Sequence, residues 1–422
     1  MHSVTNAIPT GTIASIPAKA HAHRALICAA LANSPSTILL SRTSKDIDAT
    51  MDSLRGLGAH VIYENNIVTV TPGPVPAKGN VVPHESGTTL RLLLPVAASI
   101  CNDVDVDAKG RLPDRPLEPM LGEMKAHGVT FSQDKPPFTM TGRLQGGNFS
   151  MVGDVSSQFF SGLLLAAPQI GLSTITSTTP LQSSDYVTLT TETMRDFGVE
   201  VEHTLPDTNI NEAFTVPFGA SFIGRDNYQI EGDWSNAAIW MVAAGMTGKP
   251  ITITGMNKNS VQADRRIMQV MIDAGCDVVW DGMNITVTGR ASKPIHADLE
   301  QMPDMLPVMA ALACSISGKS SFIKGARLRL KESDRLIAVA NLVRDLGGTV
   351  REEGDDLYII GSGILKGGHG DCINDHRLVM AGTLMALISE NSVTLKDSEA
   401  ITKSYPDFFE DWNLLGGDAH GI

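Results

Sequence analysis

The chain repeats one unit of about 70 residues six times along its length. In each unit a short turn ends an apolar helix and opens an alternating strand, and a second helix then stops at a glycine. Those glycines are Gly58, Gly128, Gly198, Gly275, Gly347 and Gly416, separated by 70, 70, 77, 72 and 69 residues. Self-similarity at a fixed period is typical of folds assembled from copies of one supersecondary unit. The sequence therefore predicts six related units that together account for all 422 residues.

The fourth copy shows the predicted content of a unit most clearly. Residues 237–245 are apolar nearly all round, which predicts a buried helix. Residues 251–254 alternate as a half-buried strand, and residues 264–275 combine helical spacing with a glycine C-cap. Residues 277–280 and 284–288 predict a hairpin around an Asp-Gly turn. Each copy therefore consists of a helix, a strand, a second helix and a strand pair.

The size of the unit predicts how the copies assemble. One copy cannot bury its own helices, so copies must share a core, and two groups of three are the simplest arrangement. The break falls near 228–233, after the longest interval between glycines. The last copy has no terminal hairpin of its own, so we expect a strand near 8–16 to complete it. These features predict an α/β protein in which a domain of residues 16–228 is inserted into a discontinuous domain of residues 1–15 and 229–422.

Composition excludes several classes of protein. The chain has 33 Lys and Arg against 46 Asp and Glu, a net charge of −13, which argues against a generic nucleic-acid binder. No uncharged apolar run reaches the roughly 18 residues that a membrane span needs. Its cysteines lie far apart, without a CxxC pair, as expected for reduced thiols rather than a disulfide framework or a zinc site. We therefore predict a cytoplasmic protein that binds neither nucleic acid nor membrane.

Charged and polar residues gather where the predicted buried helices begin. A helix N-terminus offers unpaired N–H groups and the positive end of the helix dipole, so it favours anions. Arginine and lysine beside several such termini suit a ligand with phosphate and carboxylate groups. Any one of these residues could instead be a helix cap or a surface ion pair, but their recurrence from copy to copy favours an anion site. They are Lys19, Arg24, Arg91, Ser156, Ser157, Gln158, Asp304 and Arg377, together with Lys331, Glu332 and Arg335 at the start of an outer helix.

Nine motifs in order, from about Ile16 to Phe409, resemble the 5-enolpyruvylshikimate-3-phosphate (EPSP) synthase family. A single short motif is moderately specific, whereas nine with order and spacing kept are highly so. The motifs are Pro17-Ala-Lys-Ala-His-Ala-His-Arg24-Ala-Leu, Glu85-Ser-Gly-Thr-Thr-Leu-Arg91, Asp114-Arg-Pro116, Asp154-Val-Ser-Ser-Gln158-Phe, Gly232-Asp-Trp-Ser235, Met302-Pro-Asp304, Leu330-Lys-Glu-Ser-Asp-Arg335, Asn374-Asp-His-Arg377 and Thr402-Lys-Ser-Tyr-Pro-Asp407.

The resemblance implies a fold, a reaction and a quaternary state. Each domain is expected to contain three βαβαββ units around parallel buried helices, an inside-out α/β barrel, with the active site in the cleft between the domains. The implied reaction transfers the enolpyruvyl group of phosphoenolpyruvate to the 5-hydroxyl of shikimate 3-phosphate. It releases phosphate through a tetrahedral addition intermediate. The resemblance implies a monomer that needs no metal and no organic cofactor.

The resemblance also implies roles for particular residues. Asp304 is the candidate base for the attacking hydroxyl, Glu332 the candidate for moving the proton at the methylene carbon, and Lys19 lies near the leaving phosphate. The implied phosphoenolpyruvate site comprises Lys19, Gly87, Arg115, Gln158, Arg335, Arg377 and Lys403. The implied shikimate 3-phosphate site comprises Lys19, Ala20, Arg24, Ser156, Ser157, Gln158, Ser183, Tyr186, Asp304 and Lys331.

The sequence departs from the family around its first lysine. The family usually has Ser-Lys-Ser, whereas this chain has Ala18-Lys19-Ala20. The second serine normally gives a hydroxyl to shikimate 3-phosphate. Losing a hydrogen bond to a charged group costs about 1.5–3 kcal/mol, roughly a 10- to 150-fold weakening. We therefore expect weak shikimate 3-phosphate binding unless another contact compensates.

Two other functions stay open on the sequence. The enolpyruvyl transferase that acts on UDP-N-acetylglucosamine shares the six-unit fold, but it usually carries a cysteine on the loop corresponding to residues 110–115. That loop has no cysteine here, and Ser156 to Gln158 fit the shikimate enzyme better. A relative that only binds a phosphorylated metabolite would explain Ala18 and Ala20. The retained acids and cations argue against it.

Overall fold

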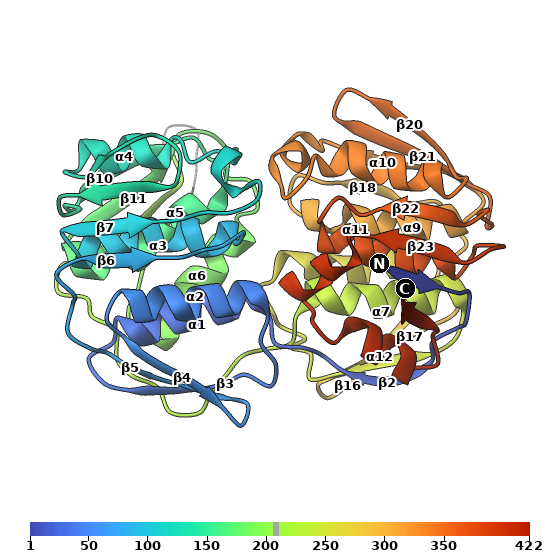
Figure 1. Ribbon diagram of the computed structural model, residues 1–422, viewed down its shortest axis with the longest axis horizontal. Coiled ribbons are helices and arrows are strands. Elements are labelled where there is room, and N and C mark those ends of the chain that lie inside the picture. Colours follow the sequence, from blue (N-terminus) through green and yellow to red (C-terminus); the bar gives the residue numbers. More distant parts are fainter. Residues whose placement is uncertain (206–210) are drawn as a thin grey trace. The chain divides into compact units, whose positions relative to one another are not determined.

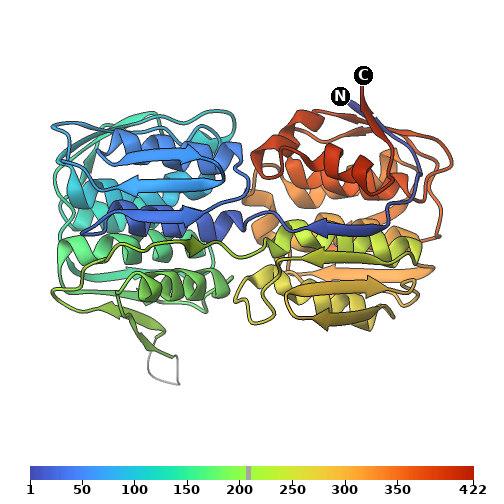
Figure 2. The ribbon, with the colours of Figure 1, turned by 90° about the horizontal axis from the view of Figure 1, so that it is seen from below.

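The computed structural model describes residues 1–205 and 211–422, which divide into two compact units. The inserted unit comprises Pro17–Ile230, and the discontinuous unit comprises Met1–Ile16 and Glu231–Ile422 (Figure 1). Each unit has its own hydrophobic core of buried side chains. In Figure 2 most helices and strands within each unit lie roughly along one axis.

The inserted unit contains three copies of the βαβαββ repeat. Its buried helices are α1 (Lys19–Ala30), α3 (Gly87–Ile100) and α5 (Ser157–Ile170), which contact one another. Its amphipathic helices are α2 (Lys45–Gly56), α4 (Met120–Ala126) and α6 (Asp185–Asp196). Its first sheet has the strand order β14 (Tyr228–Gln229), β3 (Ser36–Leu39), β5 (Ile67–Thr71) and β4 (His60–Glu64). The second has the order β6 (Gly79–Val81), β7 (Asp103–Val106), β9 (Phe138–Thr141) and β8 (Thr130–Phe131). The third has the order β10 (Gly147–Met151), β11 (Ser173–Ser177), β13 (Ala213–Val216) and β12 (Glu202–Thr204).

The discontinuous unit repeats this plan. Its buried helices are α7 (Trp234–Thr247), α9 (Leu306–Ser315) and α11 (His376–Ala386), again in mutual contact. Its other α-helices are α8 (Ile267–Asp273), α10 (Arg335–Asp345) and α12 (Phe408–Leu414). Its first sheet has the strand order β2 (Gly11–Ala14), β15 (Ile251–Thr254), β17 (Asn284–Thr288) and β16 (Asp277–Asp281). The second has the order β18 (His296–Asp298), β19 (Gly318–Ile323), β21 (Asp356–Gly361) and β20 (Thr349–Glu353). The third has the order β22 (Gly368–Asp371), β23 (Val393–Lys396), β1 (His2–Val4) and β24 (Ala419–Gly421).

All six sheets share one pairing pattern, which confirms the predicted repeat and fold class. In each, one edge strand pairs in parallel with its neighbour, and the other two pairings are antiparallel. The six glycines predicted to end helices all adopt positive φ, from +87° to +103°, where a side chain would be strained. They thus explain why every amphipathic helix stops where it does.

The strand that completes the last copy differs from the prediction. Residues 8–16 do not complete it, because β2 pairs in parallel with β15 of the fourth copy, with Ile13 opposite Ile253. The last sheet is completed by β1, whose Val4 is fully buried opposite Val393. Burial decides this assignment, because each of these two short segments places one aliphatic side chain in a different part of the core.

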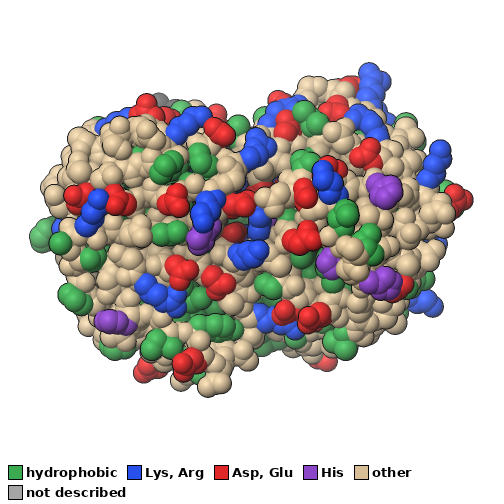
Figure 3. All heavy atoms as spheres, viewed as in Figure 1, with side chains coloured by type: hydrophobic (Ala, Val, Ile, Leu, Met, Phe, Trp, Pro, Cys, Tyr) green, Lys and Arg blue, Asp and Glu red, His purple; other side chains and the backbone are tan. Residues whose placement is uncertain are grey.

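Two structural features concern the nucleic-acid binders and membrane proteins that the composition argued against. On the face seen in Figure 3, acidic and basic side chains are interspersed within each unit rather than collected into a basic stripe. Over the described ranges, no helix combines the length and the apolar character needed to cross a membrane.

Candidate active site

Arg335 organises the charged residues of the discontinuous unit. Its guanidinium donates through Nη1 to Asp304 Oδ1 (2.6 Å), through Nη2 to Glu332 Oε2 (2.6 Å) and through Nε to Asp375 Oδ2 (2.8 Å). The Arg335 side chain is only 2% exposed and Asp375 is fully buried, whereas the side chains of Asp304 and Glu332 are 19% and 23% exposed. Lys331 adds a second cation, with Nζ 3.1 Å from Asp304 Oδ1. The candidate base and the candidate proton carrier therefore share one buried guanidinium.

Local sequence explains how these side chains reach one place. Asp304 lies in the 3-10 turn Pro303–Met305 that leads into α9. Asp375 caps α11 by accepting a hydrogen bond from the Arg377 amide (3.0 Å). Arg335 is the first residue of α10, and Asp334 caps that helix. The N-termini of α9, α10 and α11 thus bring together residues up to 71 positions apart in the chain.

Electrostatics keep Asp304 ionised in this arrangement. Burial opposes its ionisation, but Lys331, Arg335 and Arg377 outweigh burial and hold the pKa of Asp304 well below its usual range. Burial lowers the pKa of Lys331, and the charge of Asp304 opposes that shift. The pKa of Arg335 is raised despite burial, because Asp375, Glu332 and Asp304 all favour its charged form. The cluster is therefore a network of ion pairs.

Arg377 and Lys403 are the other predicted binding cations that lie in this unit. Arg377 Nη1 donates to the Ser235 carbonyl (3.2 Å). Its Nε is buried and has no hydrogen-bond partner among the residues that the structure describes. Lys403 ends the 3-10 helix Ser398–Lys403, and its Nζ donates to the Asn374 carbonyl (2.8 Å).

In the inserted unit, the N-termini of α3 and α5 share a polar cluster. Gln158 Oε1 accepts from Arg91 Nη1 (3.0 Å), and Gln158 Nε2 donates to Thr88 Oγ1 (2.8 Å). Gly87 begins α3 so close to Arg115 that a Cβ on Gly87 would lie 2.5 Å from Arg115 Nη1. An anion at this helix terminus would meet backbone N–H groups together with the Arg115 guanidinium.

The N-terminus of α1 contributes Lys19 and Arg24. Lys19 Nζ pairs with Asp46 Oδ2 at 2.8 Å. Arg24 is buried, and its Nη1 donates to the carbonyl of Ala20 (2.7 Å). Arg24 also donates to Thr190 Oγ1 (2.7 Å) and to the Tyr186 carbonyl (2.9 Å). Burial lowers the pKa of Arg24 to about 10, which still leaves it charged at neutral pH.

Serines and Tyr186 mark the starts of α5 and α6. Ser156 caps α5 by accepting from the Gln158 amide (3.3 Å), and Ser157 is its first residue. Ser183 is buried with φ of +54°, just before α6, which carries Tyr186 in its first turn. Each unit thus carries part of the predicted set at its helix N-termini.

Sequence reasoning missed several residues that hold these side chains. Asp375 lies within the quoted motif 374–377 but received no role, because its contact with Arg335 spans 40 positions. Asp264 accepts a hydrogen bond from the Ser235 hydroxyl, yet its local pattern showed only the start of a helix. Asp46 is likewise an ordinary acid in the first turn of α2. Only charge pairing across the fold distinguishes these acids from helix caps.

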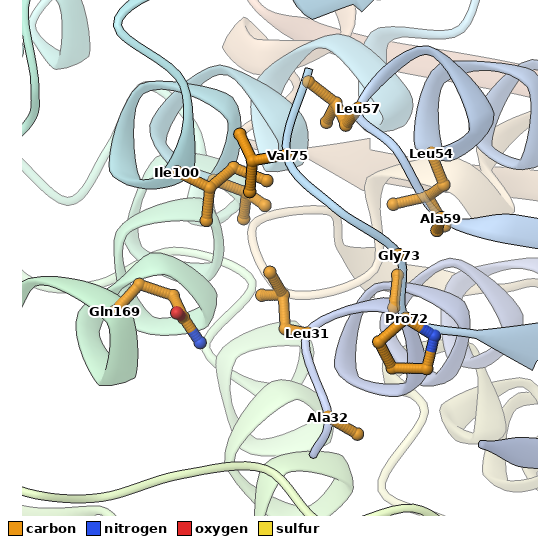
Figure 4. A pocket seen from close by; sticks show the side chains of 12 residues that line it. Leu31, Ala32, Leu54, Leu57, Ala59, Pro72, Gly73, Val75, Ile100 and Gln169 are labelled. Carbon is orange, nitrogen blue, oxygen red and sulfur yellow. The ribbon is translucent and has the colours of Figure 1, made fainter. Parts of the chain in front are cut away.

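Two further observations concern other kinds of site. A cavity of about 190 Å³ in the inserted unit lies where α1 and α3 end, near Leu31 and Ile100 (Figure 4). Its lining is mainly aliphatic, with Leu54, Leu57 and Val75 among the side chains, so it does not suit an anion. Across residues 1–205 and 211–422, no three His, Cys, Asp or Glu side chains are placed to hold a metal ion.

The fold and the charged helix termini define a two-unit α/β protein of the enolpyruvyl transferase fold. The family model described as EPSP synthase (3-phosphoshikimate 1-carboxyvinyltransferase) matches residues 7–412. The chain belongs to the EPSP synthase family.

Individual relatives match this chain over nearly its whole length. The chain is 36% identical over 413 residues to 3-phosphoshikimate 1-carboxyvinyltransferase of Clostridium kluyveri, covering 97% of this chain and 95% of the relative. It is 34% identical over 417 residues to the protein of that name from Methanocorpusculum labreanum, covering 97% of each. Among solved structures, EPSP synthase of Acinetobacter baumannii superposes with a TM-score of 0.81 at 22% identity, over 99% of both chains.

Proposed function

We propose that this protein transfers the enolpyruvyl group of phosphoenolpyruvate to the 5-hydroxyl of shikimate 3-phosphate and releases phosphate, a step of aromatic amino acid biosynthesis. Its family membership over residues 7–412 supports this reaction. The observation that carries it is the pairing of Asp304 and Glu332 on one buried guanidinium, that of Arg335. This pairing holds two carboxylates side by side at helix N-termini suited to anions.

The proposed chemistry has two stages. In the addition, the acceptor oxygen bonds to C2 of phosphoenolpyruvate, Asp304 takes the hydroxyl proton, and a proton reaches C3 through Glu332. In the elimination, C3 loses a proton to Glu332, the C2–C3 double bond forms again, and the C2–O bond to the phosphate breaks. The leaving phosphate takes up a proton from water, and Asp304 returns the hydroxyl proton to water. Lys19 is positioned to stabilise the leaving phosphate. Atoms and charge balance without a metal or an organic cofactor.

Substrate charge has a defined role in this proposal. Asp304 is a weak base while Lys331 and Arg335 hold its pKa low. Shikimate 3-phosphate binding to Lys331, and phosphoenolpyruvate binding to Arg335, would offset those positive charges. The pKa of Asp304 then rises toward the range of a useful base. The protein would thus avoid protonation of its base until both substrates are present.

The remaining proposed contacts follow substrate chemistry. Arginines suit the carboxylate of phosphoenolpyruvate, because a guanidinium can bond both oxygens, and lysines suit phosphate. The proposed phosphoenolpyruvate partners are Lys19, Gly87, Arg115, Gln158, Arg335, Arg377 and Lys403. The proposed shikimate 3-phosphate partners are Lys19, Ala20, Arg24, Ser156, Ser157, Gln158, Ser183, Tyr186, Asp304 and Lys331.

Phosphate release tests the acceptor directly. Purified protein is given phosphoenolpyruvate with shikimate 3-phosphate, and in parallel with UDP-N-acetylglucosamine. Release with shikimate 3-phosphate alone is expected. Release with the sugar nucleotide instead would identify the other enolpyruvyl transfer, and a folded protein silent with both would be a relative that only binds.

Replacing Gly87 with alanine should weaken phosphoenolpyruvate binding. The new Cβ would meet Arg115 Nη1 at 2.5 Å, and the flexible end of that arginine can move away. We therefore expect a several-fold higher KM for phosphoenolpyruvate, little change in the KM for shikimate 3-phosphate, and an unchanged unfolding temperature. Steady-state kinetics and a thermal melt measure these quantities, and an unchanged phosphoenolpyruvate KM would remove Arg115 from the site.

Replacing Ala20 with serine should strengthen shikimate 3-phosphate binding. Ala20 lies in the first turn of α1 beside Arg24, so a hydroxyl there would face the proposed phosphate partners. A hydrogen bond to a charged group predicts a KM lower by roughly 10- to 150-fold for shikimate 3-phosphate alone. The matched control is Ala18→Ser at the uncapped N-cap, which should stabilise α1 by about 1 kcal/mol without that change in KM. An unaltered KM in A20S would show that another contact already compensates.

We also infer that the protein acts as a monomer in the cytoplasm. Its five cysteines are all unpaired and buried, as suits a reducing compartment. Light scattering during size-exclusion chromatography should give a mass near 44.9 kDa, and about twice that value would indicate a dimer.

A further inference from the structure

Asp264 connects to Arg377 through a single residue. It lies in the 3-10 turn Ala263–Arg266 and is only 2% exposed. The Ser235 hydroxyl donates a hydrogen bond to Asp264 Oδ2. Ser235 belongs to the first turn of α7, and its carbonyl accepts from Arg377 Nη1 (3.2 Å). The carboxyl of Asp264 therefore lies at one end of a chain of contacts that ends at the Arg377 guanidinium.

The turn that carries Asp264 is itself held in place. Gln262 Oε1 accepts from the Trp234 amide (3.1 Å), and its Nε2 donates to Glu231 Oε1 (2.8 Å) and the Gly232 carbonyl (2.9 Å). These bonds join residues about 30 positions apart and fasten the turn to the start of α7. Asp264 is thus presented to Ser235 by a fixed backbone rather than by a loose loop.

Arg377 has an unused donor at the end of this chain. Its side chain is 6% exposed, and its buried Nε has no hydrogen-bond partner among the described residues. A buried N–H group without a hydrogen-bond partner costs free energy, so an anion that accepts from Arg377 Nε would remove that cost. Whether an anion can do so depends on the direction in which the guanidinium points. The Ser235 carbonyl, on Nη1, determines part of that direction.

We propose that Asp264 is a positioning residue for Arg377: through Ser235 its ionised carboxylate holds the first turn of α7, so that the Ser235 carbonyl aims the guanidinium at the substrate carboxylate. This inference rests on the proposed function, in which Arg377 binds phosphoenolpyruvate. Asp264 touches no substrate in this account and acts only through Ser235 and its own charge.

The charges around Asp264 make this role depend on pH. They come from Arg377 on α11, Asp304 ahead of α9 and Asp233 ahead of α7. Burial, followed by the charge of Asp304, raises the pKa of Asp264 to about 6, while Arg377 and the Ser235 hydroxyl oppose the shift. Below about pH 6 the neutral acid no longer attracts Arg377. Phosphoenolpyruvate binding should then lose the contribution of Asp264.

Asp264→Asn imitates the neutral acid at every pH and should fold. Because folding raises the pKa of Asp264, the folded chain binds that proton more tightly than the unfolded chain. The contribution of Asp264 to the free energy of unfolding therefore falls as pH rises through 6, because its carboxyl must ionise in a buried place. A neutral amide of the same shape avoids this loss of stability. A melting temperature at pH 8 equal to or above that of the wild type is expected.

The test compares phosphoenolpyruvate KM between D264N and wild type from pH 5 to pH 8. The ratio of the two values cancels the titration of the substrate itself. We expect a ratio of about ten at pH 8 that falls toward one at pH 5, with the shikimate 3-phosphate KM unchanged. A ratio independent of pH, or an equal rise in both KM values, would mean that Asp264 is merely structural and would overturn the proposal.

Ser235→Ala and the double variant test the connection. Residues that act in series should not add, so the double variant should be no weaker than the worse single variant. A rise in the phosphoenolpyruvate KM of the double variant equal to the product of the two single rises would overturn the proposal. Asp273→Asn, on the exposed side of α8, is the matched control and should leave both KM values unchanged.

Calorimetric binding of phosphoenolpyruvate separates this inference from the proposed reaction. Binding needs no turnover, so the same dependence of the affinity ratio on pH should appear even if shikimate 3-phosphate proves not to be the acceptor. A wild-type protein that releases phosphate while D264N matches it at every pH would overturn the inference alone. A wild-type protein that fails to bind phosphoenolpyruvate would overturn both.

Discussion

Replacing Asp304 with asparagine should lower kcat by roughly 10²- to 10⁴-fold, the range typical of a lost general base. Asparagine keeps the shape and can still accept from Arg335 Nη1, which bonds Asp304 Oδ1 at 2.6 Å. It cannot take a proton from the acceptor hydroxyl. The expected loss therefore falls on the chemical step, with both KM values within a few-fold of wild type. Phosphate release under saturating substrates measures it.

A matched control separates catalysis from charge. Asp298→Asn removes an acid of the same unit that pairs with Lys324 on the surface, so its kcat should stay within two-fold of wild type. If D304N kept its kcat but raised the shikimate 3-phosphate KM, Asp304 would be a binding residue, and the base would have to be sought at Glu332. Single-turnover rates would distinguish slow chemistry from slow product release.

Replacing Arg335 with methionine should cost about 3–5 kcal/mol of unfolding free energy at pH 7, as expected when one partner of a buried ion pair is removed. Three carboxylates would lose their common partner, and one of them, Asp375, is completely buried. Activity should also disappear, since Asp304 and Glu332 would no longer be held together. Urea unfolding measures the free energy, and Arg344→Met on the same helix is the control, because Arg344 forms an exposed pair with Glu352.

The stability loss in R335M should shrink as the pH falls from 7 to 5. Without the guanidinium, burial and mutual repulsion raise the pKa values of the three carboxylates, so protonation relieves their cost. In the wild type the pKa of Asp304 lies well below 4, and the stability from its ionisation is lost only as pH falls through that low value. The wild type should therefore gain nothing from Asp304 over this window. An equal loss at both pH values would contradict the proposed charge network.

The local elements could be predicted because their causes are local. The glycine at each helix end and the alternation of Ile251 to Thr254 depend only on neighbouring residues, and the structure confirms both. The closing strand of the last sheet was predicted wrongly. Residues 2–4 and residues 8–16 differ little in pattern, and only the buried places of Val4 and Ile13 assign them to different sheets.

The residues of the candidate site also divide into those that the sequence could name and those that it could not. Motifs name Asp304, Glu332 and Arg335 from the sequence, because their residue types and order resemble a family. Their roles in substrate binding and catalysis stay predictions until the kinetic experiments are done. Asp264 and Asp375 could not be recognised as supporting residues, because each looks like an ordinary acid at the start of a helix.

The sequence by itself determined the repeat, the helices and strands of each copy and the family, because periodicity, capping and motif order are properties of neighbouring residues. Only the tertiary structure decided which strand closes each sheet and which carboxylates share the Arg335 guanidinium. Those choices join positions up to 419 residues apart, as in the pairing of His2 in β1 with Gly421 in β24. They depend on burial and on charges that meet only after the chain has folded.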